Sequence, residues 1–146
     1  ADGRRALDKL AELAEVAPTS IVLMGRSLGG GVAVALAAET PVRGMVLDRT
    51  FGRLTDTAAA HYPWLPVRWF MQNRFDSIER IASYHGPLLQ THGTEDRIVP
   101  FAMGKELFDA APSSQKHFIP IEGGDHNGPL PEDCYDALGE FLEGLE

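Results

Sequence analysis

The stretch MGRSLGGG, residues 24–31, places a serine between glycines in the pattern G-x-S-x-G. Aliphatic residues precede the motif at 21–24 and the small-residue segment VAVALAAE follows it at 32–39, which predicts a strand, a sharp turn and a helix. A nucleophilic serine needs such a turn, because only there does its hydroxyl project clear of a sheet beside backbone N–H groups. The sequence therefore makes Ser27 a candidate nucleophile, with a turn serine that caps a helix as the alternative.

The residues on either side of Ser27 fit the same hypothesis. Gly25 and Gly29 are predicted to let the strand and the helix approach closely around a residue in a strained conformation. The helix is predicted to begin at about Leu28, so that its positive end points toward a developing oxyanion. The motif and its surroundings together favour a catalytic serine over a turn serine.

The rest of the chain alternates predicted strands and helices. Apolar runs predict parallel strands over residues 21–24 and 42–47, and two further strands are predicted over residues 87–91 and 116–121. Helical periodicity predicts helices over residues 2–16, 32–39, 101–110 and onward from Pro131. The capping pattern DSIE, residues 76–79, predicts one more short helix. In the last helix, apolar residues recur three and four apart at Tyr135, Leu138, Leu142 and Leu145. We predict one α/β domain over residues 1–146, with a parallel sheet of about four strands and helices on both faces.

Composition excludes several classes of partner. The chain has 146 residues and a formal net charge of −8, without a basic patch, so a nucleic-acid backbone would be repelled. The single cysteine, Cys134, excludes an internal disulfide and is compatible with a reducing compartment. No apolar run approaches the ~18 residues of a membrane span, and the first ten residues do not resemble a signal peptide. We expect a cytoplasmic protein that binds neither nucleic acid nor membrane.

A catalytic serine also needs a base and a carboxylate that orients the base. The segment THGTEDRIVP, residues 91–100, places Asp96 in the loop after the third predicted strand, and IEGGDHNG, residues 121–128, places His126 in the loop after the fourth. The carboxyl ends of parallel strands meet at one edge of a sheet, which is where ligands bind. The sequence predicts Ser27 as nucleophile, His126 as base and Asp96 as acid, with Asp48 at the end of the second strand as the rival acid.

The other polar residues near these loops have different expected roles. Asp125 is predicted to face away or to organise its loop, and Glu95 to be solvated. His92 lies at a strand end near the site, and no histidine has the spacing of a metal site, so we expect no metal and no cofactor. Residues 50–83 break the regular pattern, and five aromatic residues lie within its part 62–75, which suggests an insertion whose aromatic residues either pack or line an acyl pocket.

Four segments of the chain resemble a known family. The segments GRSLGGGVAVALA, RFDSIERI, PLLQTHGTEDRIVP and GGDHN together resemble the alpha/beta-hydrolase superfamily, and most closely its Bem46-like branch of serine hydrolases. The resemblance covers nearly the whole chain. It implies the triad Ser27, Asp96 and His126, the N–H of Leu28 as one oxyanion donor, and a short lid over residues 50–83.

The resemblance also implies what this chain lacks. Family members have about four strands and a helix before the position that corresponds to Ala1, and a loop in that part supplies the second oxyanion donor. The chain would therefore correspond to the family's strands five to eight, a truncated alpha/beta-hydrolase fold. The strand at residues 21–24 would then have an unpaired edge, from which we expect a homodimer.

The function expected from the sequence is hydrolysis of small acyl esters through an acyl-enzyme, as a carboxylesterase. Activity is expected to be weak and to favour activated esters, because loss of one oxyanion donor lowers the rate by ~10²–10³. Two alternatives stay open. One is a non-catalytic fragment that acts as a folding or assembly module, and the other is a thioesterase or peptidase that uses the same triad.

Overall fold

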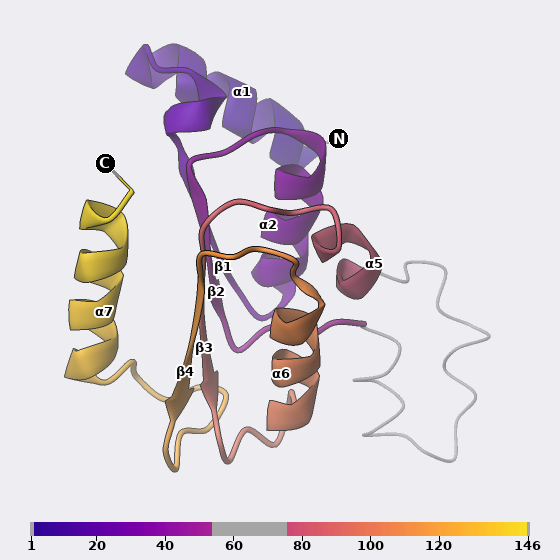
Figure 1. The fold of residues 1–146 in the computed structure, drawn as a ribbon, viewed down its shortest axis with the longest axis vertical. Coiled ribbons are helices and arrows are strands. Elements are labelled where there is room, and N and C mark those ends of the chain that lie inside the picture. Colours follow the sequence, from indigo (N-terminus) through magenta and orange to yellow (C-terminus); the bar gives the residue numbers. More distant parts are fainter. Residues whose placement is uncertain (1, 54–75, 146) are drawn as a thin grey trace.

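The computed structural model describes residues 2–53 and 76–145, and within them a four-stranded parallel sheet forms the centre of the molecule (Figure 1). Its strands lie in chain order, as β1 (Val22–Arg26), β2 (Gly44–Asp48), β3 (Leu88–Gly93) and β4 (Lys116–Ile121). The predicted number and parallel direction of the strands are confirmed. All four carboxyl ends meet at one edge of the sheet, which is therefore the edge on which the predicted site residues converge.

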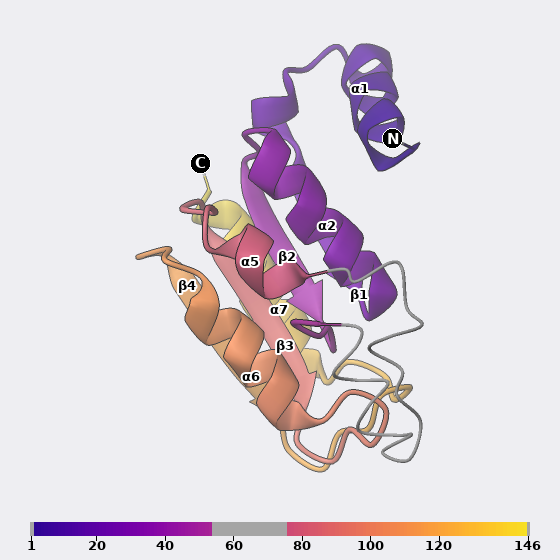
Figure 2. The ribbon, with the colours of Figure 1, turned by 90° about the vertical axis from the view of Figure 1, so that its right-hand side faces the viewer.

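Helices cover both faces of the sheet, as predicted. Figure 2 shows α2 (Leu28–Glu39), α5 (Ser77–Ile81) and α6 (Phe101–Ala110) side by side on one face, and α7 (Glu132–Glu143) lies on the other. The first helix, α1 (Asp2–Ala14), contacts α2, and a short 3-10 helix (Pro18–Ser20) leads into β1. No helix in the described part of the chain is long and apolar enough to cross a membrane.

The main core lies between the sheet and the face that carries α2, α5 and α6. Met45, Leu47 and Leu88 of the strands are completely buried there. They pack with residues of the covering helices, which include Val34, Ile81 and Leu107. At ~25 cal/mol per Å² of apolar surface removed from water, this cluster is a major source of folding free energy.

The last helix differs from its prediction in the face that it buries. Cys134 is buried, whereas Tyr135 and Leu142 are 57% and 44% exposed. The chain at the C-terminal end of α7 lies against β2, because a Cβ at Gly44 would lie 3.0 Å from the Leu145 side chain. The spacing of three and four identified the helix correctly. The sheet covers only part of the apolar face of this helix, so some of its apolar residues stay exposed.

The predicted insertion lies largely outside the described residues. The five aromatic residues from which it was interpreted are all outside them, namely Tyr62, Trp64, Trp69, Phe70 and Phe75. Its ends are described. Arg53 and Asp76 form an isolated antiparallel bridge, and their side chains form an ion pair with 3.0 Å between Nε and Oδ2. Asp76 also accepts a hydrogen bond from the Glu79 N–H, which confirms the predicted cap of α5.

Candidate active site

Ser27 is the single residue between β1 and α2. Its backbone has φ 50° and ψ −120°, in the region of positive φ that is unfavourable for a residue with a side chain. Backbone contacts hold it there, since its N–H donates to the Asp48 carbonyl at 2.9 Å and its own carbonyl accepts from the Thr50 hydroxyl at 2.6 Å. The sharp turn that the sequence motif predicted is present at Ser27.

Two of the glycines around Ser27, Gly25 and Gly30, leave no space for a side chain, whereas Gly29 does. A Cβ at Gly25 would lie 2.5 Å from the Gly29 carbonyl oxygen, so Gly25 has the predicted role of close approach. A Cβ at Gly29 would meet nothing within 4 Å, so the packing role predicted for Gly29 is wrong. Gly30 has that role instead, because a Cβ there would lie 2.1 Å from the Thr50 hydroxyl oxygen. The helix begins at Leu28 as predicted, but Gly30 rather than Gly29 is the glycine of its first turn that faces a close neighbour.

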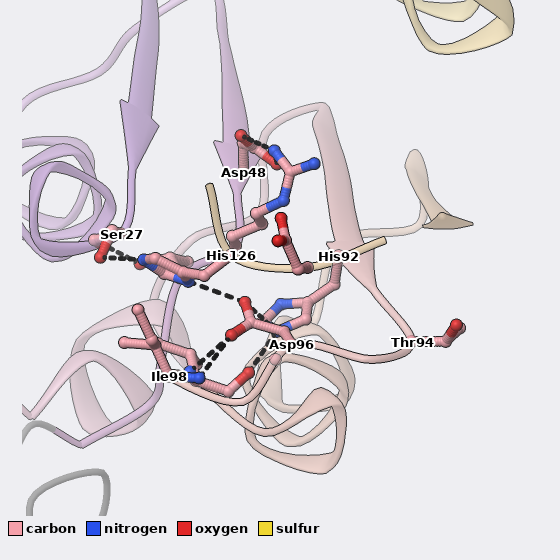
Figure 3. A network of polar contacts seen from close by, with 12 residues as sticks. Ser27, Asp48, His92, Thr94, Asp96, Ile98 and His126 are labelled. Atoms are coloured by element: carbon pink, nitrogen blue, oxygen red, sulfur yellow. Dashed lines mark hydrogen bonds and ion pairs between the residues drawn. The ribbon is translucent and has the colours of Figure 1, made fainter. Parts of the chain in front are cut away.

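His126 lies between Ser27 and Asp96 (Figure 3). Its Nε2 is 3.0 Å from Ser27 Oγ, and its Nδ1 is 2.7 Å from Asp96 Oδ2. An ionised carboxylate only accepts hydrogen bonds, so the Nδ1 of a neutral His126 carries the ring proton and donates it to Asp96. Nε2 is then free to accept the Ser27 hydroxyl proton. This geometry is that of a nucleophile, a base and an orienting acid.

The loop that follows β3 holds Asp96 firmly. The carboxylate is buried, and its other oxygen, Oδ1, accepts from the N–H groups of Ile98 and Val99 at 2.9 and 2.8 Å. One oxygen therefore binds the backbone while the other binds the imidazole. The Asp96 carboxylate has little freedom to turn away from His126.

The rival acid, Asp48, has different partners. Its carboxylate pairs with Arg49 Nη1 at 2.9 Å and with Arg26 Nε at 3.3 Å, and it accepts from the Thr91 hydroxyl at 2.8 Å. The structure thus brings Asp96, not Asp48, to the imidazole of His126. No motif indicated that Arg26 meets Asp48, because this contact depends on the register of β1 and β2.

A second histidine, His92, contacts the loop after β3 that carries Asp96. His92 is completely buried, its Nε2 lies 2.9 Å from the Val99 carbonyl, and it is 3.5 Å from Asp96 Oδ2. Burial lowers the pKa of His92 below its ordinary value, which outweighs the opposite effect of the Asp96 charge. His92 is therefore neutral and donates its Nε2 proton to the Val99 carbonyl.

The remaining predicted residues lie around this centre. Asp125 organises its loop, since Oδ1 accepts from the N–H groups of Asn127 and Gly128 at 3.0 and 2.5 Å, and Glu95 is exposed. Leu28 is the first residue of α2, where a helix leaves its N–H groups without an intrahelical partner. In residues 2–53 and 76–145, no group of three His, Cys, Asp or Glu residues is arranged to hold a metal ion.

An open hollow of about 580 Å³ lies between the loops that carry the acid and the base. Ile98 and Arg97 line it on the acid side, and His126, Asn127 and Pro129 on the other. The hollow gives solvent and small molecules access to this side of the imidazole.

Known proteins resemble this chain along most of its length. A family model described as an alpha/beta hydrolase domain matches residues 4–132. Rv2307c, an uncharacterised protein of Mycobacterium tuberculosis H37Rv, is 40% identical over 145 residues, which are 97% of this chain and 51% of that protein. Protein bem46 of Schizosaccharomyces pombe is 29% identical over 152 residues, at 97% and 49% coverage. The chain spans about half the length of these curated relatives.

Solved structures agree on the architecture. The acetyl xylan esterase from Paenibacillus sp. R4 superposes with a TM-score of 0.80 at 21% identity, over 98% of this chain and 51% of that one. At this identity the likeness concerns the fold alone.

Proposed function

Because the chain belongs to the alpha/beta-hydrolase superfamily, in its Bem46-like branch, we propose that it is a serine hydrolase that cleaves small carboxylic esters. The observation that carries the proposal is the continuous hydrogen-bonded line from Ser27 Oγ through the His126 ring to Asp96. The relatives are about twice as long as this chain, so the proposal concerns the activity that this triad supports.

The proposed reaction proceeds through an acyl-enzyme. Ser27 Oγ attacks the ester carbonyl while His126 Nε2 takes the hydroxyl proton, and Asp96 stabilises the imidazolium that forms. The N–H of Leu28 donates to the oxyanion, with the positive end of α2 behind it. His126 then gives its proton to the leaving alcohol, and a water activated by the same imidazole releases the acid. All the groups named in this scheme belong to the chain, so it needs no metal or cofactor.

Small esters are the proposed substrate class because the nucleophile is only partly accessible. Ser27 is half-buried at the turn between β1 and α2, where a compact acyl group reaches it with little reorganisation.

The first prediction tests the nucleophile with p-nitrophenyl acetate. We expect Ser27→Ala to lower kcat/KM by about 10³-fold or more, because the acyl-enzyme cannot form without the hydroxyl. Ser20→Ala is the matched control, since Ser20 is an exposed serine of the short helix before β1. A fluorophosphonate should label the wild type and Ser20→Ala but not Ser27→Ala.

The same assay separates the alternatives. Equal hydrolysis by the wild type and Ser27→Ala would contradict the proposal and favour a non-catalytic folding or assembly module. Faster turnover of an acetyl thioester or an acetyl anilide than of the matched ester would assign the triad to thioester or amide cleavage instead.

A further inference from the structure

A row of polar side chains crosses the sheet at its carboxyl edge, next to the triad. Arg26, Asp48 and Thr91 are register partners in β1, β2 and β3. Side chains in register on neighbouring parallel strands point to the same face. The three groups therefore meet on the face of the sheet that carries α7, and the row ends beside the loop that carries His126.

The centre of this row is the buried carboxylate of Asp48. It accepts from Thr91 and pairs with Arg49, whose side chain is completely buried. Arg49 has positive φ, at 47°, which is an unfavourable conformation for arginine. Because the Asp48–Arg49 pair is buried and hydrogen-bonded, its charged groups have little freedom to move, and so has any group that binds to them.

Arg26 and Arg49 each bind Asp48 and also the backbone of the loop after β4 that carries His126, called the base loop below. Arg26 Nη2 donates to the His126 carbonyl at 2.6 Å, and Arg49 Nη2 donates to the Pro129 carbonyl at 3.3 Å. The loop is thus tied at two places to guanidinium groups that share one carboxylate. The first of these places is the base residue itself.

Asp48 also binds the nucleophile. Its backbone carbonyl accepts the Ser27 N–H at 2.9 Å, while its side chain holds Arg26. One residue of β2 therefore connects to the nucleophile through its main chain and to the base through its side chain. Asp48 and Arg26 thus form a chain of contacts from the Ser27 N–H to the His126 carbonyl.

We propose that Arg26 is a positioning residue for the base, which together with Asp48 and Arg49 fixes His126 at the distance from Ser27 that proton transfer requires. This inference rests on the proposed function. A guanidinium suits the role because its planar fork reaches two acceptors at once, the Asp48 carboxylate through Nε and the His126 carbonyl through Nη2. A lysine would keep the charge but bind through a single nitrogen.

The test compares two arginines of equal exposure. The side chains of Arg26 and Arg4 are each 47% exposed, and each forms an ion pair with one aspartate, Asp48 and Asp8 respectively. We expect Arg26→Met to lower kcat for p-nitrophenyl acetate by about tenfold or more with little change in KM, because misplacement of a catalytic group slows the chemical step. Arg4→Met should retain the wild-type kcat, and Arg26→Lys should recover part of the loss.

A second measurement does not depend on activity. Backbone ¹⁵N relaxation should give order parameters of about 0.85 for the amides of residues 125–128 in the wild type and Arg4→Met, and of about 0.6 in Arg26→Met. Unchanged kcat and unchanged order parameters in Arg26→Met would overturn the proposal, as would equal losses in Arg4→Met. If the wild type hydrolyses no ester, the proposed function fails, and the order parameters still decide whether Arg26 holds the base loop.

Discussion

The corner of the molecule that holds the triad and the flank along β1 are built in opposite ways. In the triad corner, Asp96 and His126 are buried and every triad group has a fixed partner within the chain. Along the flank, β1 is the edge strand and Met24 in it is 58% exposed. Further exposed apolar residues of α1 and α2 are Leu10, Leu13, Leu28 and Val32.

This difference shows that the site depends on only part of the sheet's surroundings. The contacts that place Ser27, His126 and Asp96 come from β1 to β4 and from the loops at their carboxyl ends. None of these contacts uses the outer edge of β1, which has no partner strand in residues 2–53 and 76–145. An unpaired edge beside apolar side chains favours association with another strand, and a second copy of the chain is the partner that we expect.

The largest stability effect should come from a methyl group in the triad corner. We expect Gly30→Ala to lower the free energy of unfolding by about 3 kcal/mol, because its Cβ would overlap the Thr50 hydroxyl that binds the Ser27 carbonyl. Gly29→Ala is the matched control, since its Cβ meets nothing within 4 Å and alanine is the better helix former by up to about 1 kcal/mol. Urea unfolding of both variants measures the difference. Equal losses would show that the turn is less tightly packed than the structure indicates.

An intermediate effect should follow from pH, through His92. Burial lowers the pKa of His92 in the folded protein, whereas the unfolded chain has the ordinary value of about 6.5. Between these two values the unfolded state binds a proton that the folded state does not. The free energy of unfolding should therefore fall as pH decreases below about 6.5, by up to about 1.4 kcal/mol per pH unit.

His92→Gln isolates this contribution. The variant keeps a side-chain donor for the Val99 carbonyl but no longer titrates, so its stability should depend less steeply on pH between about 6.5 and 5. Removal of the exposed imidazole in His117→Gln is the control for a histidine outside the core. Parallel pH curves for the wild type and His92→Gln would show that His92 is not held neutral.

The smallest effect on the stability of one chain should come from the β1 flank. We expect Met24→Lys to change the free energy of unfolding of a single chain by no more than about 0.5 kcal/mol, because Met24 is mostly exposed. The same change should prevent association, since a charge on an edge strand opposes pairing. Light scattering over a dilution series tests the association, and urea unfolding of the variant and the wild type tests the change in stability. A wild type with the mass of one 15.9 kDa chain at micromolar concentration would contradict the expected homodimer.

The elements of the fold were predictable because each has a clear local signal. The bounds of α6 and β4 match the predicted residues 101–110 and 116–121, and the proline directly before the helix marks where α6 begins. The buried face of α7 was not predictable from spacing alone. Which part of an apolar stripe is covered depends on the neighbouring elements, and the sheet covers Cys134 rather than Tyr135.

The candidate triad was predictable for a different reason. The chemistry requires three residue types at the carboxyl ends of strands, and Ser27, Asp96 and His126 occupy such positions in the required chain order. The arginines beside Asp48 could not be predicted, because their contacts arise from strand register and side-chain direction. For the same reason the sequence left Asp48 open as an acid, whereas in the structure it is paired with Arg26 and Arg49.

The bridge between Arg53 and Asp76 affects how members of this family can vary in sequence length. The chain leaves the sheet region and returns to it at two residues that are already tied together, with 3.0 Å between their charged groups. Closing a longer loop at a fixed pair of ends costs only about 0.6 kcal/mol for each doubling of its length. The pair of Arg53 and Asp76 is therefore a natural boundary for exchanging the segment between them among members of the family, because a change in the length of that segment has a small entropic cost.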